Sequence, residues 1–256
     1  MVNIHAASIG RLSVLLLFLW FLPPTVSLAN SPASDAELDI ALSLADVLRA
    51  SRTEIASQQD HINNPDIGDK QLDGSVILAN ILSRLKADNK VDPSAIDPDT
   101  LKGRLLSAQL QAIREITDEN QPLLNKKGIG FKGFVPAVFA QLINERFSTI
   151  VGDEAELKVT APMQLVRNRK ARPDQWERSV LETRFGSSEW TRGELYSEET
   201  EDSRGKAFRV MVPEYYGEAC LACHGSPKGD IDITGHPKEG GELGDLGGSI
   251  SITLYR

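Results

Sequence analysis

Apolar residues recur at three- and four-residue steps through the first half of the chain, a spacing that predicts amphipathic helices. The first helix is expected to start at a Ser34-x-x-Glu37 capping-box pattern and to stop at Asn63-Asn64-Pro65. Two further helices are expected over residues 73–86 and 99–119. These stripes predict a helical core and no chemistry of their own.

The second half begins with the glycine-rich segment 128–134, which leads into a fourth helix with Pro136 in its first turn. From residue 155 apolar and polar residues alternate, which predicts strands. A short helix is expected to start at Asp174 and Glu177 and to reach Phe185. The expected strands are residues 156–160, 194–196, 207–212 and 249–254. The pattern therefore predicts an α+β fold with an antiparallel sheet.

The first 29 residues have the composition of a secretory signal peptide. Arg11 ends a basic region, residues 12–22 are apolar, and Ser27-Leu28-Ala29 offers small residues for cleavage near Ala29. The apolar run is well short of the ~20 residues that span a bilayer, although an uncleaved anchor is the alternative. We therefore expect a periplasmic or otherwise exported protein, with no transmembrane span after signal removal.

The charge balance narrows the classes of partner. The formal net charge of −8 argues against nucleic acid and against an anionic membrane surface. A redox or signalling protein in the periplasm remains the expected partner, of unknown identity.

The strongest chemical signal is Cys220-Leu221-Ala222-Cys223-His224, because Cys-x-x-Cys-His is the attachment pattern for a c-type haem. The two thiols would form thioethers to the porphyrin, and His224 would be the fifth ligand of the iron. Three alternatives remain open: a thioredoxin-like dithiol, a zinc site that adds His236, and a strained local disulfide. The export signal agrees best with covalent haem c.

Several segments together resemble a known family. They are Gly130–Ala140, Lys158–Pro162, Leu165–Asn168, Ala171–Asp174, Tyr215–Gly225 and Gly240–Ile252. The chain is similar to the Tll-like family of exported c-type haem-binding proteins with a PAS-like domain, long catalogued as a domain of unknown function. The resemblance implies a PAS-like haem-binding domain over 128–256, with a helical portion over 30–127 packed on its sheet.

The same resemblance implies one haem, covalent through Cys220 and Cys223, with His224 as a metal ligand. The sixth position is open to several candidates, of which His236 is favoured because its loop could cross the porphyrin. The others are Met163, Met211, His61 and an open or water-bound site.

Other cofactor contacts are expected from residue type. Arg167 and Arg172 belong to the one dense basic segment and could clamp haem propionates, although a solvated loop is an equal alternative. Tyr216 could pack on the porphyrin or merely end a strand.

Two functions follow from this interpretation. The favoured one is a haem protein for redox or gas sensing or for electron transfer. The other is a haem enzyme of the peroxidase or nitrogen-oxide reductase type, which requires an open distal site and an acid–base residue. No distal His–Arg pairing can be recognised in the sequence, so catalysis is the less favoured of the two.

Overall fold

The computed structural model describes Met1 and residues 32–256, so the predicted signal peptide lies outside the described residues. The residues from 32 onward belong to one compact unit. The helices are α1 (Pro32–Ser57), α2 (Gln59–Ile62), α3 (Gly74–Ala87), α4 (Leu101–Glu119), α5 (Gln121–Leu124), α6 (Pro136–Val151), α7 (Gln175–Val180) and α8 (Glu218–His224). The strands are β1 (Ala155–Thr160), β2 (Tyr196–Asp202), β3 (Gly205–Tyr215) and β4 (Leu246–Tyr255).

Side-chain caps fix where three of the helices begin. Asp73 accepts hydrogen bonds from two amides of α3, and the Thr100 hydroxyl accepts one from the Gly103 amide of α4. Asp174 and Glu177 form the complete capping box of α7, which confirms the predicted helix start. Ser34 is different: it lies inside α1, which begins at Pro32, so its expected role as the N-cap is wrong.

The four strands form one antiparallel sheet in the order β1-β4-β3-β2. Side chains alternate across it, as the pleat requires. One face is apolar and belongs to the main core, through Ala155 and Leu157 of β1, Phe208, Val210 and Val212 of β3, and Ile250, Ile252 and Leu254 of β4. The predicted α+β class is confirmed.

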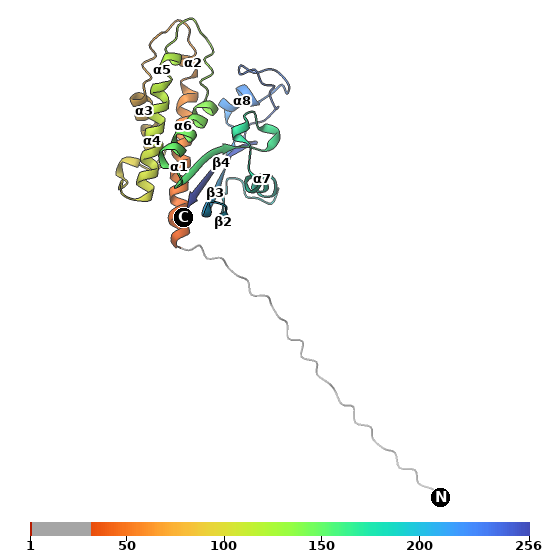
Figure 1. The fold of residues 1–256 in the computed structure, drawn as a ribbon. Helices are drawn as coiled ribbons and strands as arrows, with labels where there is room; N and C mark the ends of the chain where they lie inside the picture. Colours follow the sequence, from red (N-terminus) through yellow and green to blue (C-terminus); the bar gives the residue numbers. More distant parts are fainter. Residues whose placement is uncertain (2–31) are drawn as a thin grey trace. The chain divides into compact units, whose positions relative to one another are not determined.

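Helices α1 and α6 pack against this apolar face, and α3 and α4 pack on them in turn (Figure 1). Phe139 and Phe147 of α6 are completely buried in the core that these helices and the sheet form. The helical portion and the sheet therefore share a single hydrophobic core, and α6 belongs to both.

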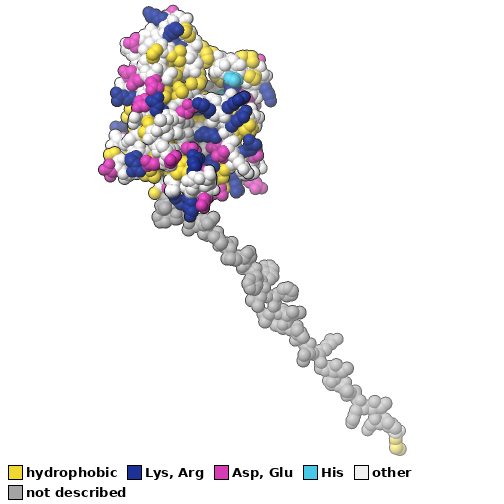
Figure 2. Space-filling model, in the orientation of Figure 1, with side chains coloured by type: hydrophobic (Ala, Val, Ile, Leu, Met, Phe, Trp, Pro, Cys, Tyr) yellow, Lys and Arg dark blue, Asp and Glu magenta, His cyan; other side chains and the backbone are white. Residues whose placement is uncertain are grey.

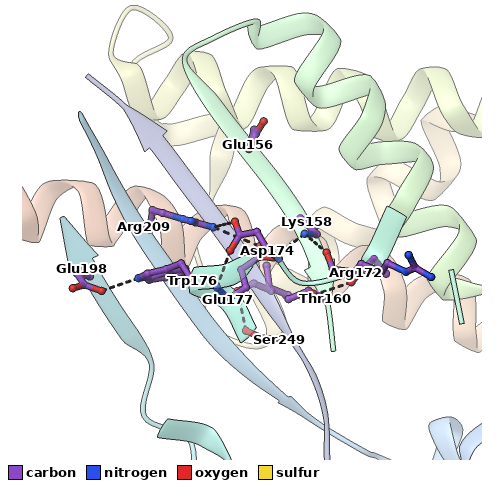
Figure 3. A network of polar contacts seen from close by, with 12 residues as sticks. Glu156, Lys158, Thr160, Arg172, Asp174, Trp176, Glu177, Glu198, Arg209 and Ser249 are labelled. Atoms are coloured by element: carbon purple, nitrogen blue, oxygen red, sulfur yellow. Dashed lines mark hydrogen bonds and ion pairs between the residues drawn. The ribbon is translucent and has the colours of Figure 1, made fainter. Parts of the chain in front are cut away.

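The opposite face of the sheet is polar, and α7 covers part of it. Lys158 of β1 donates a 2.7 Å hydrogen bond to Glu177 of α7, whose side chain is 3% exposed. Arg209 of β3 binds Asp174 at 2.6 Å and lies over the ring of Trp176 (Figure 3). Ion pairs and a small apolar cluster of Val180, Leu181 and Met211 together hold α7 and the turn after it to the sheet.

No helix within the described residues is long and apolar enough to span a membrane. The likeness of the sheet to a PAS domain, and the boundary at 127/128, stay predictions.

Candidate functional site

The Cys-x-x-Cys-His motif begins where β3 leaves the sheet. The pairing register between β3 and β4 shifts between Glu214 and Tyr215, and such a bulge redirects a strand. Glu214 is held from the other side by α1, because it accepts hydrogen bonds from Arg49 at 2.6 Å and Arg52 at 2.7 Å. The chain that enters the motif is thus attached to both the sheet and the helical bundle.

The motif itself forms α8, a single short helix. Cys220 and Cys223 are three residues apart and therefore lie on one side of it. His224 is its last residue, and Gly225 follows with its amide bonded to the Leu221 carbonyl at 2.9 Å. A Cβ at position 225 would lie 2.5 Å from that carbonyl oxygen, so the chain needs glycine to leave the helix here.

After α8 the chain forms a hairpin and returns. Backbone hydrogen bonds pair Gly229 with Lys238 and Asp230 with Lys238, and Asp232 and His236 are paired at the tip. The returning strand then meets the end of α8, where the Gly241 amide donates to the His224 carbonyl at 2.8 Å. Glu239, two residues before Gly241, is thereby brought beside His224.

The imidazole of His224 has two well-defined neighbours. Its Nδ1 lies 2.9 Å from a carboxylate oxygen of Glu239, and its ring stacks on Tyr216 with 5.0 Å between centroids and 18° between planes. Its Nε2 makes no hydrogen bond within residues 32–256. A carboxylate on Nδ1 fixes the tautomer and leaves Nε2 as the lone-pair donor, which is the usual arrangement of a metal-binding histidine.

Arg167 holds this arrangement together from the loop after β1. It donates to both oxygens of Glu239 at 2.8 and 3.0 Å, to Asp232 at 2.5 Å, and to the Cys223 carbonyl at 2.8 Å. The side chain of Asp232 is 0% exposed. Burial alone would raise the pKa of Asp232, but hydrogen bonds from Thr234, Arg167 and the His236 amide outweigh it and lower that pKa.

The carboxyl of Glu239 follows the same balance. Burial tends to raise its pKa, yet the hydrogen bonds from Arg167 and His224 lower it below the ordinary value. Glu239 is therefore an ionised acceptor for the imidazole N–H.

The thiol of Cys223 differs from that of a redox dithiol. Burial, and then the nearby charge of Asp232, raises the pKa of the Cys223 thiol, whereas reactive dithiols need a lowered one. Both thiols are free, so the local disulfide is not formed. A zinc site would need three or more clustered ligands, and residues 32–256 contain no group of His, Cys, Asp and Glu arranged to hold a metal ion in that way.

One polar atom beside the motif lacks a hydrogen-bond partner among the described residues, namely the phenol oxygen of Tyr216. Burial raises the pKa of Tyr216 to about 12, and its buried hydroxyl has no hydrogen-bond partner in the described part of the chain. Gly241 and Gly247 lie against its ring, where a Cβ would come within 2.6 and 2.4 Å of ring carbons. A buried polar group without a partner is uncommon, and beside two free thiols and a free Nε2 it fits a haem-attachment site.

The other predicted site residues are spread more widely. His236 is exposed at the hairpin tip, held through its backbone by Asp232. His61 is occupied elsewhere, since its Nε2 lies 2.9 Å from the Lys70 carbonyl oxygen. The side chain of Arg172 is exposed and points away from the polar network, and its carbonyl accepts a hydrogen bond from Lys158 (Figure 3).

The two methionines lie beside the outer sheet face. Met163 borders a cavity of about 270 Å³ with Leu181 and Leu246, and Met211 is fully buried against Val180 and Leu181. The roles of His236, His61, Met163 and Met211 as sixth ligand, and of Arg172 as a propionate clamp, stay predictions.

Acidic and basic side chains both occur on the face drawn in Figure 2, within the described residues. That nucleic acid is not a partner stays a prediction, which rests on the formal net charge of −8.

Fold and site together define a class: an α+β domain that presents a Cys-x-x-Cys-His helix between the end of β3 and a returning loop. The chain belongs to the Tll0287-like family, whose model matches residues 30–254. No curated protein matches the chain. No solved structure matches it either.

Sequence reasoning missed Glu239 and Asp232. They lie 72 and 65 residues from Arg167 along the chain, and only the fold brings the three side chains together. The signal that could have suggested Glu239 is weak: an acidic residue immediately before Gly240-Gly241, in a loop that must return to the motif.

Proposed function

We propose that this protein carries one covalently attached haem c and acts in the periplasm in redox or gas sensing or in electron transfer. The observation that carries the proposal is the state of His224. It ends the Cys-x-x-Cys helix with Nδ1 bonded to a carboxylate and with Nε2 free.

The residues divide the work as follows. The sulfurs of Cys220 and Cys223 would hold the porphyrin edge, and Nε2 of His224 would bind the iron. Glu239 and Tyr216 keep the imidazole from rotating, one by a hydrogen bond and one by stacking. When bound, the haem supplies an iron that gains or loses one electron.

The attachment of the site to α1 supports sensing. Glu214 lies two residues before Tyr216 and makes ion pairs with two arginines of α1, which runs through the centre of the bundle. A displacement of Tyr216 would therefore be transmitted to the long helix α1 through Glu214. A simple electron carrier does not need this connection.

Covalent attachment is tested with protein expressed through the export pathway of a bacterium that matures c-type cytochromes. Intact mass is measured on the denatured protein, and the pyridine haemochrome spectrum is recorded. We expect the mass of one haem on the wild type, and a haemochrome band altered by loss of one thioether in Cys223→Ala. Ser226→Ala, an exposed position in the same loop, is the matched control and should resemble the wild type. Haem-free wild-type protein from such cells would contradict the proposal.

A haem enzyme with an open distal site is the second candidate, and one observation favours it. The partner of Nδ1 is a carboxylate, which makes the proximal ligand more basic and more electron-donating. Carbon monoxide separates the two candidates. A reduced wild type that ignores carbon monoxide, with a reactive His236→Ala, would establish His236 as the sixth ligand and favour electron transfer or redox sensing. Immediate binding by the wild type would favour gas sensing or catalysis.

A further inference from the structure

We propose that Glu239 is a positioning residue that makes His224 a strongly basic iron ligand and holds the reduction potential of the haem low, and that Arg167 fixes Glu239 for this role. The inference rests on the proposed function, because it needs an iron on Nε2. The inference goes beyond the proposed function because it assigns the control of the haem reduction potential to two residues outside the motif.

The first step is the geometry at the imidazole. The 2.9 Å contact joins Nδ1 to Oε2 of Glu239, and these side chains are only 29% and 16% exposed. A carboxylate that accepts the Nδ1–H draws the proton away from the ring and raises the electron density on Nε2. A more basic axial ligand stabilises the oxidised iron more than the reduced iron, so the potential falls.

The second step is that the carboxylate is already held in place. Arg167 grips both oxygens of Glu239 in a two-point contact and simultaneously binds Asp232. Arg167 also donates to the Cys223 carbonyl at 2.8 Å, which connects this group to the residue next to His224. The folded chain therefore fixes the orientation of the Glu239 side chain before any iron is bound.

The third step is the charge of the cluster. One guanidinium faces two carboxylates, so Arg167, Asp232 and Glu239 together carry one net negative charge. Asp232 is completely shielded from water and Glu239 largely so, and charges in such surroundings are weakly screened. A negative cluster behind the ligand favours the oxidised iron, in the same direction as the hydrogen bond.

The test is a redox titration of the haem-loaded protein. In Glu239→Gln the side chain can still accept the N–H bond, but the charge is gone. We expect the equilibrium constant for one-electron reduction to rise at least tenfold, which is about 59 mV. Glu242→Gln is the matched control: it removes the same charge from an exposed position three residues along the loop, and should change the constant less than threefold. Glu239→Asp, which restores the charge, should recover part of the shift.

A second readout separates tuning from simple destabilisation. The electron paramagnetic resonance g values of the ferric haem report the axial ligand field, and we expect Glu239→Gln to change them while Glu242→Gln does not. A potential and g values equal to those of the wild type in fully loaded Glu239→Gln would overturn this inference and leave the proposed function intact. A wild type without covalent haem would instead remove the proposed function.

If Glu239→Gln does not accumulate, Glu239→Asp decides. A change in the reduction constant of at least threefold is expected for it, since the shorter side chain cannot keep both the Arg167 and the His224 contacts. An unchanged constant and unchanged g values in that variant would equally overturn the inference.

Discussion

The helical bundle and the motif loop are stabilised by different physics. The bundle and the inner sheet face bury a continuous apolar core, in which each side chain has many neighbours. The loop from α8 to β4 contributes no residue to that core and is held by backbone pairs and by one arginine that bridges two carboxylates and a carbonyl. Truncating one core side chain should therefore lower the stability of the whole bundle. Truncating one side chain that holds the loop should instead free only that loop.

The largest effect is expected in the bundle. Phe139→Ala removes a completely buried ring of α6 from the main core and should lower the free energy of unfolding by about 3–5 kcal/mol. Urea unfolding measures it. Val138→Ala, next to it but 38% exposed, is the control and should cost less than about 1 kcal/mol. Equal costs at the two positions would contradict the packing described.

The second effect should be local. Arg167→Gln leaves the buried Asp232 without its counter-charge, which costs about 3–5 kcal/mol when one partner of a buried ion pair is lost. We expect hydrogen-exchange protection at the Gly241 amide to fall on the order of 100-fold, as the loop opens by itself. Protection in α4 should stay unchanged.

Arg172→Gln is the matched control for this change, because its exposed side chain makes no ion pair with the described residues. If Arg167→Gln lowers the global free energy of unfolding and the exchange protection of the loop equally, the loop and the bundle unfold as one cooperative unit. That result would contradict the difference between the two regions described above.

A smaller effect is expected from the one carboxylate that joins α1 to α3. Glu54 is 2% exposed and accepts hydrogen bonds from Arg84, Asn80 and Gln58. Burial raises its pKa, but these bonds outweigh it and the pKa lies below the ordinary 4.5. Glu54→Gln should cost about 1–3 kcal/mol at pH 7.

The pH dependence of this cost has a definite sign. The pKa is lower in the folded state, so the stabilisation is complete above 4.5 and is lost as the pH falls through the folded-state value. The free energies of unfolding of the wild type and Glu54→Gln, measured in urea, should therefore converge as the pH falls. A stability difference that stays constant from pH 7 to pH 3 would show that the charge of Glu54 does not contribute.

The fold was largely predictable because local patterns agreed with the global arrangement. The helix periodicity and the alternation in β1, β3 and β4 describe residues that face one common core. The Asp174 capping box marks the start of α7, which lies on the opposite face of the sheet. The N-terminal pattern failed at Ser34 because a capping sequence can also lie inside a helix that starts earlier.

Strand β2 was expected only as residues 194–196 and in fact covers Tyr196–Asp202. The C-terminal part of this strand, Glu198 to Asp202, is nearly all acidic, and such a charged segment is unfavourable in the centre of a sheet. It lies at the edge of the sheet, where charged residues are tolerated and protect against further pairing.

The site was predictable only as far as its residues are consecutive. Cys220, Cys223 and His224 are adjacent in the sequence, and their chemistry follows from their spacing. Arg167 was singled out for its charge, with a propionate as the expected partner, and the structure shows Glu239 and Asp232 as its partners. Such long-range pairs depend on the path of the chain, which no local pattern encodes.

The central claim is that His224 binds a covalently held haem iron through Nε2 while Glu239 holds Nδ1. A crystal structure of the exported protein, with the iron located by anomalous scattering, tests it most directly. We expect iron at bonding distance from Nε2 of His224, thioethers at both cysteines, and a Glu239 oxygen still within about 3 Å of Nδ1. Iron bound without His224, or a Glu239 side chain turned away from the imidazole, would contradict it.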